Sequence, residues 1–235
     1  MISKINFLFY CPDIQITNCL DTVDSQHCVK VLRNTTGDKI HVTDGNGGWY
    51  LCQITDANPK KCQLVILEEE QNYQKPCRKI SLAICPTKSA DRIEYLIEKA
   101  VEIGLHEVFF VSTQNTYPKR VNMERMTKIA VSAMKQSLKA YLPILHDYSK
   151  LDVFLKNTKG YNQKFLAHLD HKSQPLTAMK IADSPLIFVG PEGDFSESEI
   201  ELINQNGFET VTLGSSRLRT ETAGVVSVSL LNLLP

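Results

Sequence analysis

The sequence predicts an α/β protein with a mostly parallel sheet, preceded by a smaller strand-rich unit. From about residue 75 onward, short apolar runs alternate with helical patterns, which is typical of a parallel sheet covered on both faces. Before that point, β-favouring runs are separated by turn residues. The polar stretch from Glu68 to Pro76 has the composition of a linker. We therefore expect two domains, residues 1–74 and residues 75–235.

The first unit is expected to be a small antiparallel sheet or barrel. The opening apolar residues, as far as Ile14, lack a small-residue cleavage site, so we interpret them as a strand rather than a signal peptide. Residues 39–44 and 49–54 favour strands, and the residues between them, Gly45 to Gly48, are a strong hairpin signal. Residues 62–67 complete the predicted sheet.

In the second unit, strands are expected at residues 80–85, 108–111, 165–168, 186–189 and 210–213. Apolar residues from Ile93 to Ile103 follow helical spacing, and Gly104 is suited to end that helix. A longer helix is expected from about Met123 to Tyr141, before Pro143. Helices should also follow the last two strands.

Composition excludes several classes of protein. Lysine and arginine number 26 and so do the acidic residues, so the net charge of zero argues against a general nucleic-acid coat protein. No apolar run approaches the roughly 20 residues that a membrane-spanning helix needs. The 7 cysteines are odd in number and show no CxxC spacing, and the 6 histidines show no HxxxH pair. We expect reduced thiols, no metal, no membrane partner and a cytoplasmic location.

A basic face is predicted on the helix that begins near Met123. Arg125, Lys128, Lys135 and Lys139 fall on one side of it, because they follow one another in steps of three, seven and four residues. The opposite side can pack on the sheet, and it carries Met126, Ile129, Ala130, Ala133 and Met134. Such a face suits a phosphate backbone, but an ordinary solvated helix surface has the same pattern. Lys30 and Arg33 of the first unit leave the same two interpretations open.

Two loops in the last quarter of the chain have well-marked surroundings. After residues 186–189 comes Gly190-Pro191-Glu192-Gly193-Asp194, followed by a predicted capping box of Ser196 with Glu199. Phe195 and Ile200 occupy the positions of a hydrophobic staple, and Gly207 suits the end of that helix. After residues 210–213 comes the segment from Gly214 to Ala223, in which Thr220 is the expected N-cap of the last helix.

Both loops follow strands, and ligands of open α/β sheets bind beyond the carboxyl ends of strands, so the two loops are expected to share one site. Neither loop contains GxGxxG or GxxxxGK[ST], so a Rossmann dinucleotide site and a P-loop are unsupported. From the residues alone the ligand has no name.

These loops resemble the signature of the RsmE family of 16S ribosomal RNA uridine methyltransferases, within the SPOUT superfamily. That family reads roughly GPEGG-F-S-x-x-E and LG-x-R-I-L-R-x-E-T-A at these two places. The resemblance extends over most of the chain, with an HxxxVLR pattern at residues 27–33 and a Q-S step at residues 136–137. The chain departs from the family pattern at Asp194, a usual glycine, and at Ser216-Arg217, Lys139 and Gln114-Asn115.

The resemblance implies an N-terminal PUA-like β-barrel that helps bind RNA and a C-terminal SPOUT α/β domain with a trefoil knot. It implies a homodimer that uses S-adenosylmethionine to methylate N3 of a uridine in 16S ribosomal RNA, in the assembled small subunit. The N3 proton must leave and the base must leave its stack. Arg219 is the candidate for stabilising the resulting anion, and Glu221 or Glu192 for accepting the proton or fixing a loop.

The resemblance and the loop positions together predict two further sets of residues. The cofactor is expected to contact His168, Gly190, Pro191, Glu192, Gly193, Leu213, Gly214, Ser215, Leu218, Arg219, Thr222 and Ala223. RNA contacts are expected from Lys30, Arg33, Lys88, Arg92, Arg125, Lys128, Lys135 and Lys139. Two alternatives stay open: an inactive RNA-binding or ribosome-assembly protein on the same scaffold, and a methyltransferase for another RNA base.

Overall fold

The computed structural model describes residues 7–117, 120–169 and 173–235, and these form two compact units. The first contains the chain up to Lys75 together with Val131–Leu142, and the second contains Pro76–Ala130 and Pro143–Pro235. Residues 131–142 thus belong with the first unit although they lie far beyond it in sequence. The domain limits at residues 74 and 75 remain a prediction.

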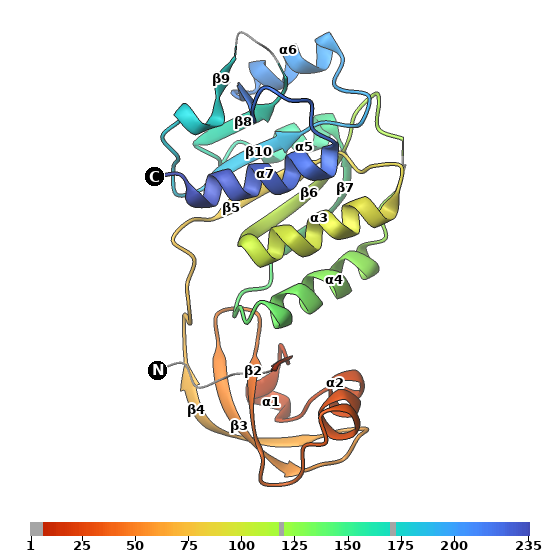
Figure 1. Cartoon of the computed structure of the whole chain (residues 1–235), viewed down its shortest axis with the longest axis vertical. Coiled ribbons are helices and arrows are strands. Elements are labelled where there is room, and N and C mark those ends of the chain that lie inside the picture. Colours follow the sequence, from red (N-terminus) through yellow and green to blue (C-terminus); the bar gives the residue numbers. More distant parts are fainter. Residues whose placement is uncertain (1–6, 118–119, 170–172) are drawn as a thin grey trace. The chain divides into compact units, whose positions relative to one another are not determined.

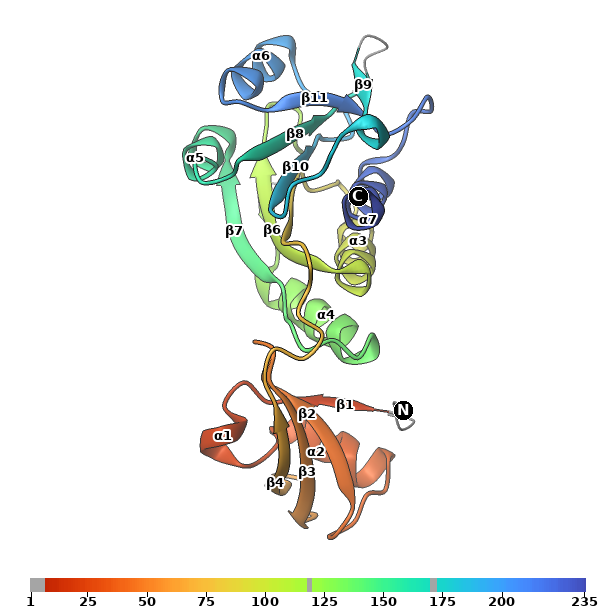
Figure 2. The same ribbon diagram turned by 90° about the vertical axis from the view of Figure 1, so that its left-hand side faces the viewer.

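The first unit is built on a four-stranded sheet in the order β1-β2-β3-β4; Figure 1 labels β2, β3 and β4, and Figure 2 labels β1 as well. Its strands are β1 (Leu8–Tyr10), β2 (Lys39–Thr43), β3 (Trp49–Asp56) and β4 (Gln63–Glu70). β1 pairs parallel with β2, whereas the other pairs are antiparallel, so the sheet is mixed and the expectation of an antiparallel sheet was wrong for this strand. A parallel neighbour requires a long connection, and here it contains helical turns. They are α1 (Ile14–Thr17), α2 (Thr22–Gln26) and a π-helical turn (His27–Val31).

Two other sequence predictions for the first unit have clear outcomes. The hairpin between β2 and β3 is present, and Gly45 and Gly47 in its turn have φ of 78° and 97°. The acidic residues Glu68, Glu69 and Glu70, however, continue β4 opposite Trp49–Leu51 instead of forming a linker. β4 ends the sheet, and charged residues are tolerated on such an edge strand because one side of it faces solvent. Of the predicted opening strand, residues 1–6 lie outside the described part of the chain.

The second unit contains a parallel sheet in the order β7-β6-β5-β10-β8-β11-β9, which confirms the predicted α/β class. All of its strand pairs are parallel. The expected strands are present as β5 (Ile80–Ile84), β6 (Leu105–Ser112), β8 (Gln163–Ala167), β10 (Pro185–Val189) and β11 (Glu209–Thr212). β7 (Ile144–Lys150) and β9 (Gln174–Pro175) were missed, because β7 is polar at its end and β9 has two residues.

Helices cover both faces of this sheet (Figure 2). α3 (Ala90–Ile103) and α7 (Thr220–Leu233) pack together on one face, where a Cβ on Gly224 would lie 2.6 Å from Leu96 Cδ1. α5 (Leu151–Asn157) and α6 (Glu197–Gln205) share a buried cluster on the other face with Phe109 and Phe188. A 3₁₀ turn (Leu176–Ala178) follows β9. None of the helices in the described residues is long and apolar enough to span a membrane.

α4 (Met123–Gln136) is shorter than the predicted helix, which was expected to reach Tyr141. The helix ends because Leu138 adopts a left-handed φ of 54°, and the amide of Lys139 turns back to the carbonyl of Met134. As expected, the side of α4 opposite the basic residues is apolar, and Met126, Ala130 and Met134 are buried.

Candidate functional site

A cleft of about 630 Å³ lies beyond the carboxyl ends of β8, β10 and β11. The strands are adjacent and parallel, so the segments that follow them meet at one edge of the sheet. The volume is in the range of pockets that hold cofactors and drug-sized ligands. The lining is mixed, with apolar residues beside backbone and charged groups. It consists of Ala167, His168, Leu169, Val189, Gly190, Pro191, Glu192, Asp194, Leu213, Gly214, Ser216, Arg217, Leu218, Arg219, Thr220 and Ala223.

The first wall of the cleft is the loop after β10, and its shape follows from its sequence. The amide of Asp194 donates to the carbonyl of Pro191, which closes a turn, and Asp194 itself has a left-handed φ of 63°. A Cβ on Gly190 would lie 2.6 Å from Phe195 Cε2, so the loop needs glycine there. The predicted capping box of Ser196 with Glu199 is present and fixes the start of α6.

The second wall is the loop after β11, which leads into α7. Gly214 has a φ of 140°, and a Cβ built on it would meet nothing within 4 Å, so the backbone is bare towards open space. Thr220 was expected to be the N-cap of α7, but Arg219 occupies that position. The hydroxyl of Thr220 instead donates to the carbonyl of Gly190 (3.2 Å). That hydrogen bond ties the two walls of the cleft together.

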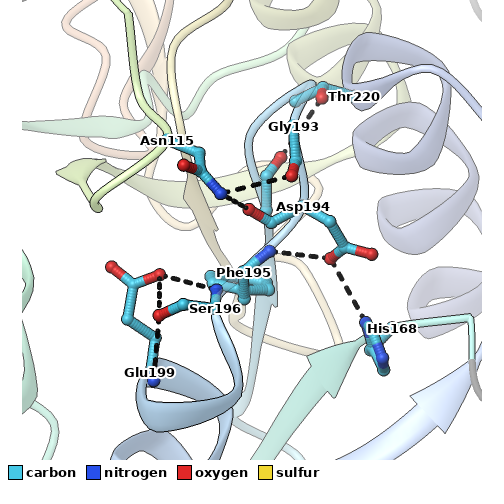
Figure 3. A network of polar contacts seen from close by, with 9 residues as sticks. Asn115, His168, Gly193, Asp194, Phe195, Ser196, Glu199 and Thr220 are labelled. Carbon is cyan, nitrogen blue, oxygen red and sulfur yellow. Dashed lines mark hydrogen bonds and ion pairs between the residues drawn. The ribbon is translucent and has the colours of Figure 1, made fainter.

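A polar network holds the first wall from both sides (Figure 3). The amide group of Asn115, which follows β6, donates to the carbonyls of Gly193 (3.2 Å) and Asp194 (2.9 Å). On the other side, Asp194 Oδ1 lies 3.2 Å from His168 Nδ1 and accepts the amide of Phe195 (2.8 Å). Neither Asn115 nor Asp194 was predicted from the sequence to have a role. Both residues differ from the family pattern at their positions, and this difference was the one sign in the sequence that could have drawn attention to them.

Charges around the cleft divide into paired and unpaired groups. Arg92 of α3 holds Glu192 (2.5 Å) and lies 3.7 Å from Glu221, whose second oxygen is buried and makes no hydrogen bond with the described residues. Arg217 and Arg219 line the cleft and form no ion pair within the described part of the chain. The cleft therefore presents two guanidinium groups that are available to an anionic ligand or transition state.

Most of the predicted cofactor-binding residues line the cleft. Gly193, Ser215 and Thr222 are not among the lining residues, and neither is Glu221, which faces Arg92 from the first turn of α7. The residues that line the cleft without having been predicted to bind the cofactor are Ala167, Leu169, Val189, Asp194, Ser216, Arg217 and Thr220.

The predicted basic face of α4 is largely neutralised inside the protein. Arg125 pairs with Glu94 (2.7 Å) and Lys128 with Glu124 (2.5 Å). Lys135 holds Asp24 at 2.6 Å, and the side chain of Asp24 is 7% exposed. The partners Glu94 and Asp24 lie 31 and 111 residues away in the chain, so helical periodicity could not predict these two pairs.

The other residues predicted to contact RNA have different environments. Lys139 follows α4, and burial lowers its pKa. Lys30 and Arg33 are exposed on the first unit. Lys88 lies over the ring of Tyr117, with 4.9 Å between its ammonium and the ring centroid.

The cysteines are unpaired thiols, and most are buried. Burial raises the pKa of Cys85 to about 12, so this thiol is protonated at neutral pH. Within residues 7–117, 120–169 and 173–235, no group of three or more histidine, cysteine or acidic side chains could hold a metal ion.

Comparisons with known proteins agree over both units. A family model described as an RNA methyltransferase domain matches residues 73–232, and one described as an RNA methyltransferase PUA domain matches residues 20–67. Among curated proteins, Ribosomal RNA small subunit methyltransferase E from Rickettsia conorii is 29% identical over 88% of this chain and 86% of its own length. The protein of the same name from Bacillus subtilis is 26% identical over 86% and 84%.

Solved structures show the same similarity. A crystal structure of a probable rRNA-methyltransferase from Porphyromonas gingivalis is 38% identical, with a TM-score of 0.90 over 96% of this chain and 98% of that one. A protein from Legionella pneumophila, solved in complex with the bound cofactor SAM, is 25% identical, with a TM-score of 0.86 over 95% and 96%.

Proposed function

The chain belongs to the RsmE family of ribosomal RNA methyltransferases, and from that premise we propose that it methylates N3 of a uridine in small-subunit ribosomal RNA with S-adenosylmethionine. The observation that supports this proposal most is the single cleft that both family loops build at the carboxyl edge of the parallel sheet. The relatives that cover most of this chain carry a name that states methyl transfer to small-subunit ribosomal RNA, while the uridine and its N3 are part of this proposal.

The cleft fits the cofactor. Bare backbone at Gly214 and the apolar side chains of Val189, Leu213 and Leu218 suit a flat base, and nearby carbonyl and amide groups suit the polar edges of a nucleoside. Residues of both walls, from Gly190 to Glu192 and from Leu213 to Ala223, would hold it together with His168. When bound, the sulfonium of the cofactor supplies an electrophilic methyl group, so the residues need only activate and align the nucleophile.

Arg219 is proposed to stabilise the nucleophile. Uridine N3 carries a proton, and the anion left by its loss spreads over the two neighbouring carbonyl oxygens. The guanidinium of Arg219 forms no ion pair with the described residues, and its backbone is fixed as the N-cap of α7, so it can donate to such an oxygen. With the anion stabilised, a weak proton acceptor is sufficient, and Glu192, Asp194 and His168 lie at the wall of the cleft.

Glu221 is proposed to position a loop and not to take part in the reaction directly. It is 8% exposed and faces Arg92, which in turn holds Glu192 of the first wall. A carboxylate in the first turn of α7 is also favoured by the helix dipole. Glu221 therefore acts on the cleft through Arg92 and Glu192.

The remaining parts of the proposal concern assembly and substrate. We place the enzyme in the cytoplasm with its RNA and propose a homodimer, the trefoil knot around the cofactor, and the assembled small subunit as substrate. On α7, Leu233 is 82% exposed and Val225, Val226 and Leu230 are partly exposed, which supports a partner on this helix.

Calorimetry with S-adenosylmethionine and transfer of a labelled methyl group to purified small subunits test the proposal. We expect one cofactor per chain and saturable labelling of the RNA. Binding without any transfer would favour the inactive RNA-binding alternative, and an absence of binding would refute the proposed function. Size-exclusion chromatography with light scattering tests the dimer separately.

A further inference from the structure

Lys88 differs from the other cations of the second unit that the sequence predicted to contact RNA. Arg92, Arg125 and Lys128 are each held by a carboxylate. Lys88 is exposed and forms no ion pair with the residues that the structure describes. Its ammonium lies over the ring of Tyr117, 4.9 Å from the ring centroid. Its charge is therefore not neutralised within the described part of the protein.

Tyr117 is 71% exposed, more than any other aromatic side chain in the described residues. Lys88 covers one face of its ring, and a side chain exposed to this degree leaves the opposite face open to solvent. An aromatic ring in water forgoes the free energy of burying a large apolar surface. An open ring face next to an unneutralised ammonium is the combination that binds a nucleic-acid base together with a backbone phosphate.

The topology places this pair beside the cleft. Lys88 follows β5 and Tyr117 follows β6, and these parallel strands end near one another, since Ile84 at the end of β5 lies opposite Phe110 and β6 continues only to Ser112. β10, which leads into the first wall of the cleft, lies on the other side of β5. Asn115, two residues before Tyr117, donates to the carbonyls of Gly193 and Asp194 in that wall. Two residues span at most about 7 Å, so Tyr117 is close to the wall.

We propose that Tyr117 and Lys88 form a stacking site for an unpaired RNA base at the rim of the cleft. The base stacks on the open face of the Tyr117 ring, and the ammonium of Lys88 contacts a phosphate of the same strand. The inference rests on the proposed function, since it names a contact of that RNA substrate. A base that is methylated must leave its stack, and a stacking partner beside the cleft offsets part of that cost.

The binding of a fluorescein-labelled, uridine-rich single-stranded RNA of about ten nucleotides, followed by fluorescence anisotropy, tests the proposal. Stacking on an aromatic ring makes Tyr117→Ala weaken binding by roughly 5- to 100-fold, while Tyr117→Phe, which keeps the ring, stays within about twofold. Tyr95 of α3, which is 52% exposed, is the matched control, and Tyr95→Ala should bind like the wild type.

The salt dependence of the same measurement separates the two side chains. Lys88→Ala should reduce the slope of log affinity against log salt by about 0.7, the value for one phosphate of a single strand, and Tyr117→Ala should leave the slope unchanged. Wild-type affinity in Tyr117→Ala, or an equal loss in Tyr117→Phe, would overturn the stacking site. A wild-type chain that binds S-adenosylmethionine but not this RNA would also overturn it. A wild-type chain that neither binds the cofactor nor transfers methyl would instead refute the proposed function.

Discussion

The face of α4 and the loop after β11 both carry several cations in the sequence, but their environments in the structure are opposite. Arg125, Lys128 and Lys135 are held by carboxylates. Arg217 and Arg219 of the loop line a cleft and have no carboxylate partner in the described residues. A row of cations on a helix therefore does not by itself indicate a binding surface. Cations that have no carboxylate partner and that line a cleft are a better indication of a binding surface.

The largest expected effect concerns the unpaired charge of the cleft. Arg219→Ala should lower turnover by roughly 10²-fold or more, because a donor aimed at developing charge contributes that much to typical enzymes. The free energy of unfolding should change little, since the side chain makes no ion pair with the described residues. Steady-state methyl transfer and urea denaturation measure the two quantities. Unchanged turnover would contradict the assigned role, and Arg125→Ala is the paired-cation control that should remain active.

The second prediction concerns the paired charge of α4. Lys135→Ala leaves the buried carboxylate of Asp24 without its counter-ion, and breaking a buried pair of this kind, here discounted for partial exposure, should cost about 2 kcal/mol of stability. Turnover below the unfolding transition should stay near the wild-type value. Lys128→Ala, in which the lysine side chain is 68% exposed, should leave the unfolding midpoint almost unchanged. Equal midpoints for the two variants would show that burial does not distinguish these pairs.

Glu107 differs from the carboxylates of these ion pairs, because mainly neutral side chains donate hydrogen bonds to it. Burial acts to raise the pKa of Glu107, but hydrogen bonds from Tyr161 (2.5 Å), Ser81 and His146 outweigh burial and hold the pKa below its ordinary value. A depressed carboxyl pKa contributes stability above the unfolded pKa, and this contribution is lost as pH falls through the folded pKa.

Tyr161→Phe removes one of these donors and should destabilise the protein at pH 7 by about 1.5 kcal/mol, a typical value for a hydrogen bond to a charged group. The difference from the wild type should shrink as the pH falls through the lowered pKa of the folded wild type, because Glu107 is then protonated in both proteins. Urea denaturation at pH 7 and at a pH low enough to protonate Glu107 in the folded wild type measures this difference. A difference that is the same at both values would mean that Tyr161 acts through packing alone.

The smallest effect is expected at Asp194, the acidic residue beside His168. In Asp194→Gly, the glycine can adopt the left-handed φ of this position without strain. The substitution removes the contact of the carboxylate with His168 Nδ1, so the imidazole is held less firmly at the cleft wall. We expect affinity for S-adenosylhomocysteine to fall by about threefold, less than one kcal/mol. Asp194→Asn, which retains a hydrogen-bonding oxygen, should bind more tightly than Asp194→Gly. The reverse order in calorimetry would show that the carboxylate hinders binding.

Local patterns predicted local structure well. The capping box at Ser196, the glycine that ends α3 and the hairpin at Gly45 were found where the sequence placed them, because each depends on residues within one or two turns. The end of α4 was misplaced, since the left-handed Leu138 is not a residue type that marks a helix end. The parallel pairing of β1 depends on long connections, which periodicity does not report.

The candidate site was predicted only in part, because local sequence patterns do not report contacts between residues that are far apart in the chain. The two loops of the cleft were found, because each follows a strand and carries glycines. Asn115 was missed because it reaches the wall from a strand about 80 residues earlier in the chain. The ion pair of Glu221 with Arg92 could not be predicted either, since it depends on the packing of α3 against α7.

The cleft is proposed to serve the methylation of one uridine, and the modified nucleoside itself can be identified. Small subunits that lack the modification should be incubated with the protein and S-adenosylmethionine, and their RNA digested to nucleosides for mass spectrometry. We expect close to one N3-methyluridine per subunit with the wild-type chain and little with Arg219→Ala. Methylation of another base, or equal yields from the two proteins, would contradict it.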